Sequence, residues 1–171
     1  ALRDMPLVWF PVLGENRLSQ VMKVEGSIPS WAEICPVLPH PSRNPRRGDE
    51  LLVEYNGILF ARRETPLSNI LHVHEAHPFE AYRQLLSAML RYRSTMDVIG
   101  GCRLVVTPLA SKLVTIGSAL ACFEMKLISH DRRSSVAIPY AEPKRYVAKL
   151  ADLRASQPEI SALMLTGDAY S

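Results

Sequence analysis

The sequence has 171 residues, of which 47% are apolar and 22% charged, which is the composition of an ordinary globular domain and not of a disordered chain. Its 20 basic and 17 acidic residues give a formal charge of only +3, so duplex nucleic acid is not an expected partner. The longest nearly uncharged apolar stretch, residues 113–123, is too short for a bilayer, which needs roughly 20 residues. No membrane partner is therefore expected.

The length predicts one domain with a single core over residues 1–171. The start at Ala1, without an initiator Met, suggests a domain taken from a longer protein. The three cysteines, Cys35, Cys102 and Cys122, form neither a disulfide framework nor a Cys-x-x-Cys metal motif. Buried free thiols are expected instead, and with them a cytoplasmic location.

Five short apolar runs recur about every 30 residues, which is the length of a strand followed by a helix. The predicted strands are residues 7–13, 34–38, 70–73, 104–107 and 136–139. The segments between them carry apolar residues at helical spacing. The predicted helices are a short one within residues 15–26, one from Pro45 through Leu59, one over 79–96, one from Pro108 through Phe123, and one or two within 144–163, where Pro158 breaks the pattern.

This alternation predicts a three-layer α/β domain, Rossmann-like, with a mostly parallel sheet of five or six strands and helices on both faces. Ligands of such sheets bind beyond the carboxyl ends of the strands. Neither Gly-x-Gly-x-x-Gly nor Gly-x-x-x-x-Gly-Lys-Ser/Thr occurs in the sequence, so no cofactor is expected. The residues that follow each strand are the candidate site.

The first loop contains Gly14, Glu15 and Asn16. Glycine permits a tight turn or a close approach to a ligand, and the helix that follows offers free N–H groups. Alternatively, Glu15 only complements the positive end of the helix dipole.

The fourth strand leads into Thr107, then Ser111 and Lys112, just before an apolar helix. Small and hydroxyl residues at a strand-to-helix turn leave backbone N–H groups open to an anion. Lys112 would oppose the helix dipole unless a bound phosphate lay between them. The alternative is that Thr107 caps the helix and Lys112 extends into water.

Two more loops offer cations and an aromatic ring. Arg43 and Arg46, in the proline-rich loop after the second strand, have the guanidinium geometry that suits phosphate, or they belong to a surface ion-pair network. Tyr140 follows the fifth strand and offers a face on which a base could stack. The alternative there is a helix start at Pro143, with Tyr146 in the core.

Histidines surround the end of the third strand. His72 and His74, two residues apart, would share one face of a strand, and Glu75 or His77 could complete a divalent metal site. The alternative is buried, hydrogen-bonded imidazoles. No His-Glu-x-x-His motif accompanies them.

Residues 104–106, the turn through Ser111 and Lys112, and the small residues 117–119 resemble the strand-four element of CRISPR-associated Rossmann-fold (CARF) domains. Leu109 and Ala110 stand where that family usually has glycines. The resemblance implies a homodimeric module that binds cyclic oligonucleotides or related nucleotides. It would use Gly14, Glu15 and Asn16 together with the turn at Thr107, Ser111 and Lys112.

Three functions follow from these residues. The first is a sensor that binds a nucleotide or another anionic small molecule and controls an attached or partner effector, as a homodimer built on the helix over residues 79–96. The second is a small metal-assisted hydrolase of a phosphorylated or nucleotide substrate that uses His72, His74 and Glu75. The third is an interaction domain with a vestigial pocket. The absence of a Gly-x-Ser-x-Gly elbow and of a paired-carboxylate motif favours the sensor.

Overall fold

The structure is a computed structural model that describes residues 5–129, 134–139, 141–142, 150–155 and 159–165. The chain divides into two compact units, residues 1–141 and residues 142–171. The first, which we call the sheet unit, holds all strands of the described residues. The second contains helix α5 (Leu150–Ala155). Within the described residues no helix combines the length and the apolar composition needed to cross a membrane.

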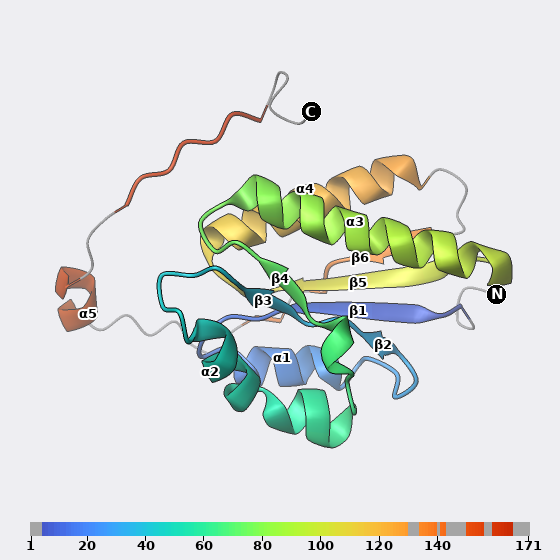
Figure 1. Ribbon diagram of the computed structural model, residues 1–171, viewed down its shortest axis with the longest axis horizontal. Coiled ribbons are helices and arrows are strands. Elements are labelled where there is room, and N and C mark those ends of the chain that lie inside the picture. Colours follow the sequence, from blue (N-terminus) through green and yellow to red (C-terminus); the bar gives the residue numbers. More distant parts are fainter. Residues whose placement is uncertain (1–4, 130–133, 140, 143–149, 156–158, 166–171) are drawn as a thin grey trace. The chain divides into compact units, whose positions relative to one another are not determined.

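A six-stranded, all-parallel sheet forms the middle layer of the sheet unit, which confirms the predicted fold class (Figure 1). Its strands are β1 (Leu7–Val12), β2 (Glu33–Ile34), β3 (Val37–Pro39), β4 (Leu71–Val73), β5 (Cys102–Pro108) and β6 (Ser134–Ala137). The strand order is β4-β3-β1-β5-β6, and β2 also pairs with β1. Strand β1 is buried along its whole length, because a central parallel strand is covered on both faces.

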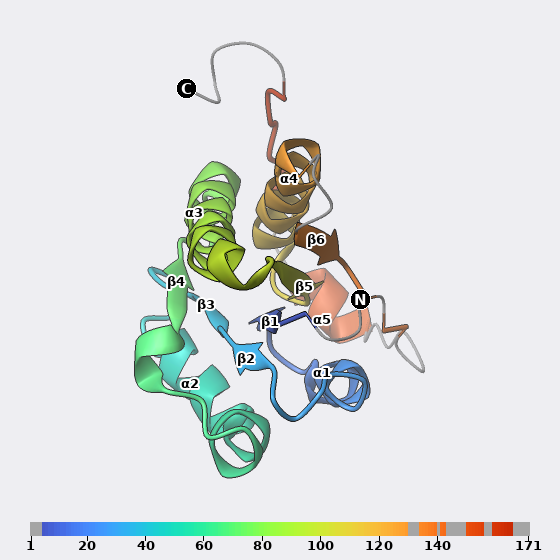
Figure 2. The ribbon, with the colours of Figure 1, turned by 90° about the vertical axis from the view of Figure 1, so that its right-hand side faces the viewer.

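Helices cover the sheet on both sides (Figure 2). On one face lie α1 (Leu18–Glu25), α2 (Arg47–Glu54) and the π-helical turn η2 (Gly57–Arg62). On the other, α3 (Pro78–Met96) packs beside α4 (Lys112–Ile128). Short 3-10 turns, η3 (Leu67–Asn69) and η4 (Asp97–Ile99), precede β4 and follow α3. The core beneath α1 and α2 includes Trp9 of β1, and Phe10 faces the opposite layer, where its ring meets Tyr92 of α3.

Several predicted boundaries needed correction, and β6 lies two residues earlier than the predicted strand 136–139. The predicted strand 34–38 is broken into β2 and β3 around Pro36, which has no N–H to donate to a neighbouring strand. Helix α2 begins at Arg47 and not at Pro45. Pro108 is the last residue of β5, where it pairs with Val12, so α4 begins only at Lys112. Pro78, by contrast, is the first residue of α3, as predicted.

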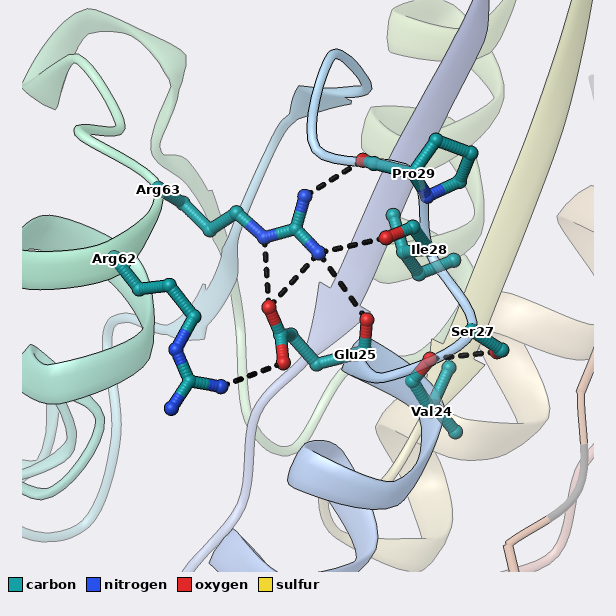
Figure 3. A network of polar contacts seen from close by, with 7 residues as sticks. All are labelled: Val24, Glu25, Ser27, Ile28, Pro29, Arg62 and Arg63. Carbon is teal, nitrogen blue, oxygen red and sulfur yellow. Dashed lines mark hydrogen bonds and ion pairs between the residues drawn. The ribbon is translucent and has the colours of Figure 1, made fainter.

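A buried ion pair joins the end of α1 to the end of η2 (Figure 3). Arg63 Nε donates to Glu25 Oε1 at 2.8 Å, and the side chains of both residues are 6% exposed. The other guanidinium nitrogens of Arg63 donate to the carbonyl oxygens of Glu25, Ile28 and Pro29. Arg62, which is 54% exposed, donates to the second carboxylate oxygen. We call this group of contacts the Arg63 clamp.

Candidate functional site

A cavity of about 190 Å³ opens at the carboxyl ends of β1, β3, β4 and β5, and we call it the carboxyl-edge cavity. It lies where the strand order turns at β1: the chain proceeds from β1 to β2 and β3 on one side, and later returns to β5 on the other. This is the place where open parallel sheets bind ligands. Its lining is Leu13, Gly14, Glu15, Arg17, Pro39, Arg47, Leu51, Glu75, Leu109, Ala110 and Ser111.

Gly14 brings two of the loops around this cavity into direct contact. A Cβ atom on Gly14 would lie 2.3 Å from the carbonyl oxygen of Leu109 and 2.9 Å from Cα of Ala110. The Leu109 N–H in turn donates to the carbonyl of Val12, at the end of β1. The close approach that glycine permits here is therefore to the loop between β5 and α4.

The loop between β1 and α1 is also fastened to α2. The Tyr55 hydroxyl, at the end of α2, donates to the Gly14 carbonyl at 2.6 Å. The backbone N–H of Asn16, which has a left-handed φ of 57°, donates to Glu54 Oε1 at 3.1 Å. Burial, together with the Glu54 carboxylate, raises the pKa of Tyr55, so its hydroxyl remains a donor at neutral pH. The loop is held open beside the cavity.

Two arginines reach the cavity from α2 and from the β1–α1 loop. Arg47, the first residue of α2, forms an ion pair with Glu15 across the lining. Its Nε is buried and has no hydrogen-bond partner among the described residues, an arrangement that typically costs about 1–3 kcal/mol. Arg17, at the start of α1, donates to Gln20 Oε1 at 3.3 Å. Both arginines line the cavity and bring positive charge to it.

Glu75 and Ser111 close the side of the cavity next to β4 and β5. One carboxylate oxygen of Glu75 accepts the backbone N–H of Arg43 at 3.1 Å. The Ser111 hydroxyl lies 3.4 Å from the Glu75 carbonyl and 3.4 Å from the Val114 N–H, so Ser111 is the N-cap of α4. The first N–H groups of a helix have no acceptor within the helix. The positive end of the 17-residue helix α4 therefore borders the cavity.

Three predicted site residues line this cavity, namely Gly14, Glu15 and Ser111. Asn16 and Lys112 are immediate neighbours of the lining, and both are exposed.

The other predicted ligand contacts lie elsewhere. Thr107 is 1% exposed, and its hydroxyl accepts a hydrogen bond from the Trp9 indole at 2.9 Å, inside the core. Arg43 and Arg46 are exposed and outside the lining. Tyr140 lies outside the described residues.

Sequence reasoning missed Arg17 and Arg47, the two cations of the cavity. A signal for Arg47 was present: it precedes the core residue Leu51 by four positions and therefore shares its helix face. That signal was overlooked because Arg47 directly follows the basic residues of the proline-rich loop, Arg43 and Arg46.

The four histidines among the described residues lie in two pairs. Strand β4 ends at Val73, so the alternation expected to align His72 with His74 stops between them. The His72 ring lies against that of His40, with centroids 5.7 Å apart, and the His74 ring lies against that of His77 at 4.1 Å. Partial desolvation and the neighbouring His40 lower the pKa of His72. Among the described residues no three His, Cys, Asp or Glu side chains are grouped as metal ligands.

Comparison of the chain with protein-family models and with curated proteins finds no match. The chemistry of the cavity is therefore the basis for its interpretation. Its lining combines two guanidinium groups, a helix N-terminus and an apolar wall formed by Leu13, Leu51 and Leu109. The two carboxylates of the lining, Glu15 and Glu75, already have partners. Such a surface suits an anionic group attached to a partly apolar body.

Proposed function

We propose that the sheet unit binds an anionic small molecule, a nucleotide or another phosphate-bearing compound, in the carboxyl-edge cavity. On this proposal the unit is a sensing module, and ligand binding controls an attached or partner effector. The resemblance of residues 104–119 to CARF domains agrees with this role but does not carry it.

The convergence of Arg17, Arg47 and the Ser111-capped end of α4 on one cavity carries the proposal. These groups come from three separate parts of the chain, and each favours negative charge. A phosphate beside them would gain charge-assisted hydrogen bonds and would supply an acceptor for Nε of Arg47, which has no partner among the described residues. The metal-assisted hydrolase has no comparable observation in its favour, because His72 and His74 lie against different neighbours.

Thermal melting of the 171-residue chain in inorganic phosphate and in AMP, at constant ionic strength, tests the proposal. A ligand that binds only the folded state stabilises it by about 2.7 kcal/mol at a concentration 100 times its Kd. We expect both probes to raise the melting temperature. Arg47→Ala should reduce that rise by most of its value, whereas Arg46→Ala, which removes the same charge from an exposed neighbour outside the lining, should preserve it.

The variant Lys112→Ala provides a second test of anion binding. Lys112 is the first residue of α4, where a positive charge opposes the helix dipole by about 0.3–1 kcal/mol. The variant should therefore be as stable as the wild type or slightly more so without ligand, and phosphate should stabilise it less. If neither probe shifts the wild-type melting temperature, or if Arg46→Ala and Arg47→Ala behave alike, the proposal is wrong.

A further inference from the structure

A second cavity, of about 300 Å³, lies at the opposite edge of the sheet, and we call it the amino-edge cavity. One wall is the last two turns of α3. The other is formed by η3, the first residue of β4 and Cys35, which precedes β3. It shares no lining residue with the carboxyl-edge cavity.

The cavity follows from a mismatch in length between packed elements. Helix α3 has 19 residues and is about 28 Å long. Strand β4, on which it packs, has only three residues and spans about 10 Å. Helix α3 therefore continues past the amino end of β4 (Figure 1), and on this side of the sheet its last turns share the cavity with the 3-10 turn η3.

Along one face of α3, the side chains change from apolar to polar. Its first part is apolar: Leu85 and Ala88 are 1% and 2% exposed. The same face continues at intervals of three and four residues, and there it carries Arg91, Tyr92 and Thr95, which line the cavity. An apolar stripe would be expected to continue if this face were buried against a strand. Here the helix is not covered by a strand: Arg91 and Thr95 are exposed, and Tyr92 is half-buried.

Two hydrogen-bond donors of this wall have no partner among the described residues. The Tyr92 ring is fixed by an edge-on contact with the fully buried Phe10, at 5.8 Å between centroids. Within the described part of the chain, neither the Tyr92 hydroxyl nor the Arg91 guanidinium makes a hydrogen bond or an ion pair. Burial raises the pKa of Tyr92 to about 12, so the hydroxyl is a donor at neutral pH.

On the opposite wall, the side chains of Asn69 and Cys35 already have hydrogen-bond partners. The Asn69 side chain donates to the Ile34 carbonyl at 3.1 Å and also to Glu33. The Cys35 thiol donates to the Asn69 carbonyl at 3.0 Å, and burial raises the pKa of this thiol to about 12. Ile70 and Leu71 add an apolar surface on that side, next to Ser68.

We propose that the amino-edge cavity binds a small carboxylate with a compact apolar body, such as an aromatic or branched-chain acid. The carboxylate accepts hydrogen bonds from Arg91 and from the Tyr92 hydroxyl, since guanidinium and phenol are both donors. The apolar body lies between Ile70, Leu71 and Met96. This site is independent of the anion proposed for the carboxyl-edge cavity.

Calorimetric titration of the 171-residue chain with benzoate, and with benzamide as its uncharged isostere, tests this assignment. Benzoate should bind at one saturable site, and benzamide at least tenfold more weakly. Arg91→Gln should weaken benzoate at least tenfold and Tyr92→Phe several-fold. Arg83→Gln, which removes the same charge from an exposed position of α3 outside the cavity, should leave the affinity unchanged.

Two further variants locate the site. Thr95→Trp, at an exposed position of the lining, should fill the cavity and abolish benzoate binding without lowering the melting temperature. Arg47→Ala should leave benzoate binding intact even if it removes phosphate binding. The assignment is overturned if benzoate does not bind, if benzamide binds equally well, if Arg91→Gln and Arg83→Gln are equivalent, or if Arg47→Ala removes benzoate binding.

Discussion

Thr107 illustrates how one side chain can satisfy a sequence pattern for a binding turn and still belong to the core. It lies near the end of β5, and its hydroxyl accepts the only N–H of the fully buried Trp9 indole. The pattern of a strand followed by hydroxyl residues was visible in the sequence. The direction of the side chain was not, because it depends on β5 continuing to Pro108.

Thr107→Val should therefore destabilise the fold without affecting the site. Valine has the same shape but removes the acceptor, and an unsatisfied buried donor costs about 1–3 kcal/mol. Urea denaturation should report that loss, and Thr107→Ser should recover part of it. Phosphate should still raise the melting temperature of the valine variant. A valine variant that folds with wild-type stability but no longer responds to phosphate would instead place Thr107 in the site.

Gly14 allows the loops after β1 and β5 to touch, and Gly48 provides a matched control glycine. Gly14→Ala would force a Cβ against the Leu109 carbonyl, and overpacking of this kind typically costs about 1–3 kcal/mol. Gly48→Ala, in α2, meets no atom within 4 Å and should stabilise by about 0.4–1 kcal/mol through the unfolded state. Denaturation midpoints should move in opposite directions. Equal shifts of the two midpoints would show that the loops after β1 and β5 can move apart without loss of stability.

At the scale of elements, the sequence predicted which segments are strands and helices better than it predicted where they join. Strand β1 and helix α3 lie close to their predicted bounds, because long periodic or uniformly apolar segments report burial directly. The turn η2 and the Arg63 clamp were not predicted. Glu25 and Arg63 are 38 residues apart, and no local pattern specifies a contact across that distance.

Among the contacts of this helix layer, we expect the loss of the Arg63 clamp to lower the free energy of unfolding most. Arg63→Met leaves the Glu25 carboxylate buried and removes the donors to three carbonyl groups, and breaking a buried pair in this way typically costs about 3–5 kcal/mol. Arg62→Ala removes an exposed partner of the same carboxylate and should cost no more than about 1 kcal/mol. Urea denaturation compares the two variants. Equal losses would contradict the assignment of the clamp to Arg63.

For the whole molecule, the alternation of strands and helices was enough to predict the parallel sheet, and the carboxyl-edge cavity lies where this topology favours ligand binding. The loops around the carboxyl-edge cavity are those expected, after β1, β3, β4 and β5. The residues within the loop after β3 were not: the start of α2 at Arg47 brings that residue to the cavity and leaves Arg43 and Arg46 exposed. Helix starts depend on tertiary contacts that residue periodicity does not contain.

The central claim is that an anion binds among Arg17, Arg47 and the first turn of α4. Titration of the ¹⁵N-labelled 171-residue chain with inorganic phosphate and with AMP, followed by amide chemical shifts, tests it most directly. The largest saturable shifts should fall on Gly14, Arg17, Arg47 and the amides that follow Ser111, all around one cavity. Shifts that do not saturate, or that are spread over exposed basic residues such as Arg83 and Arg46, would contradict the claim.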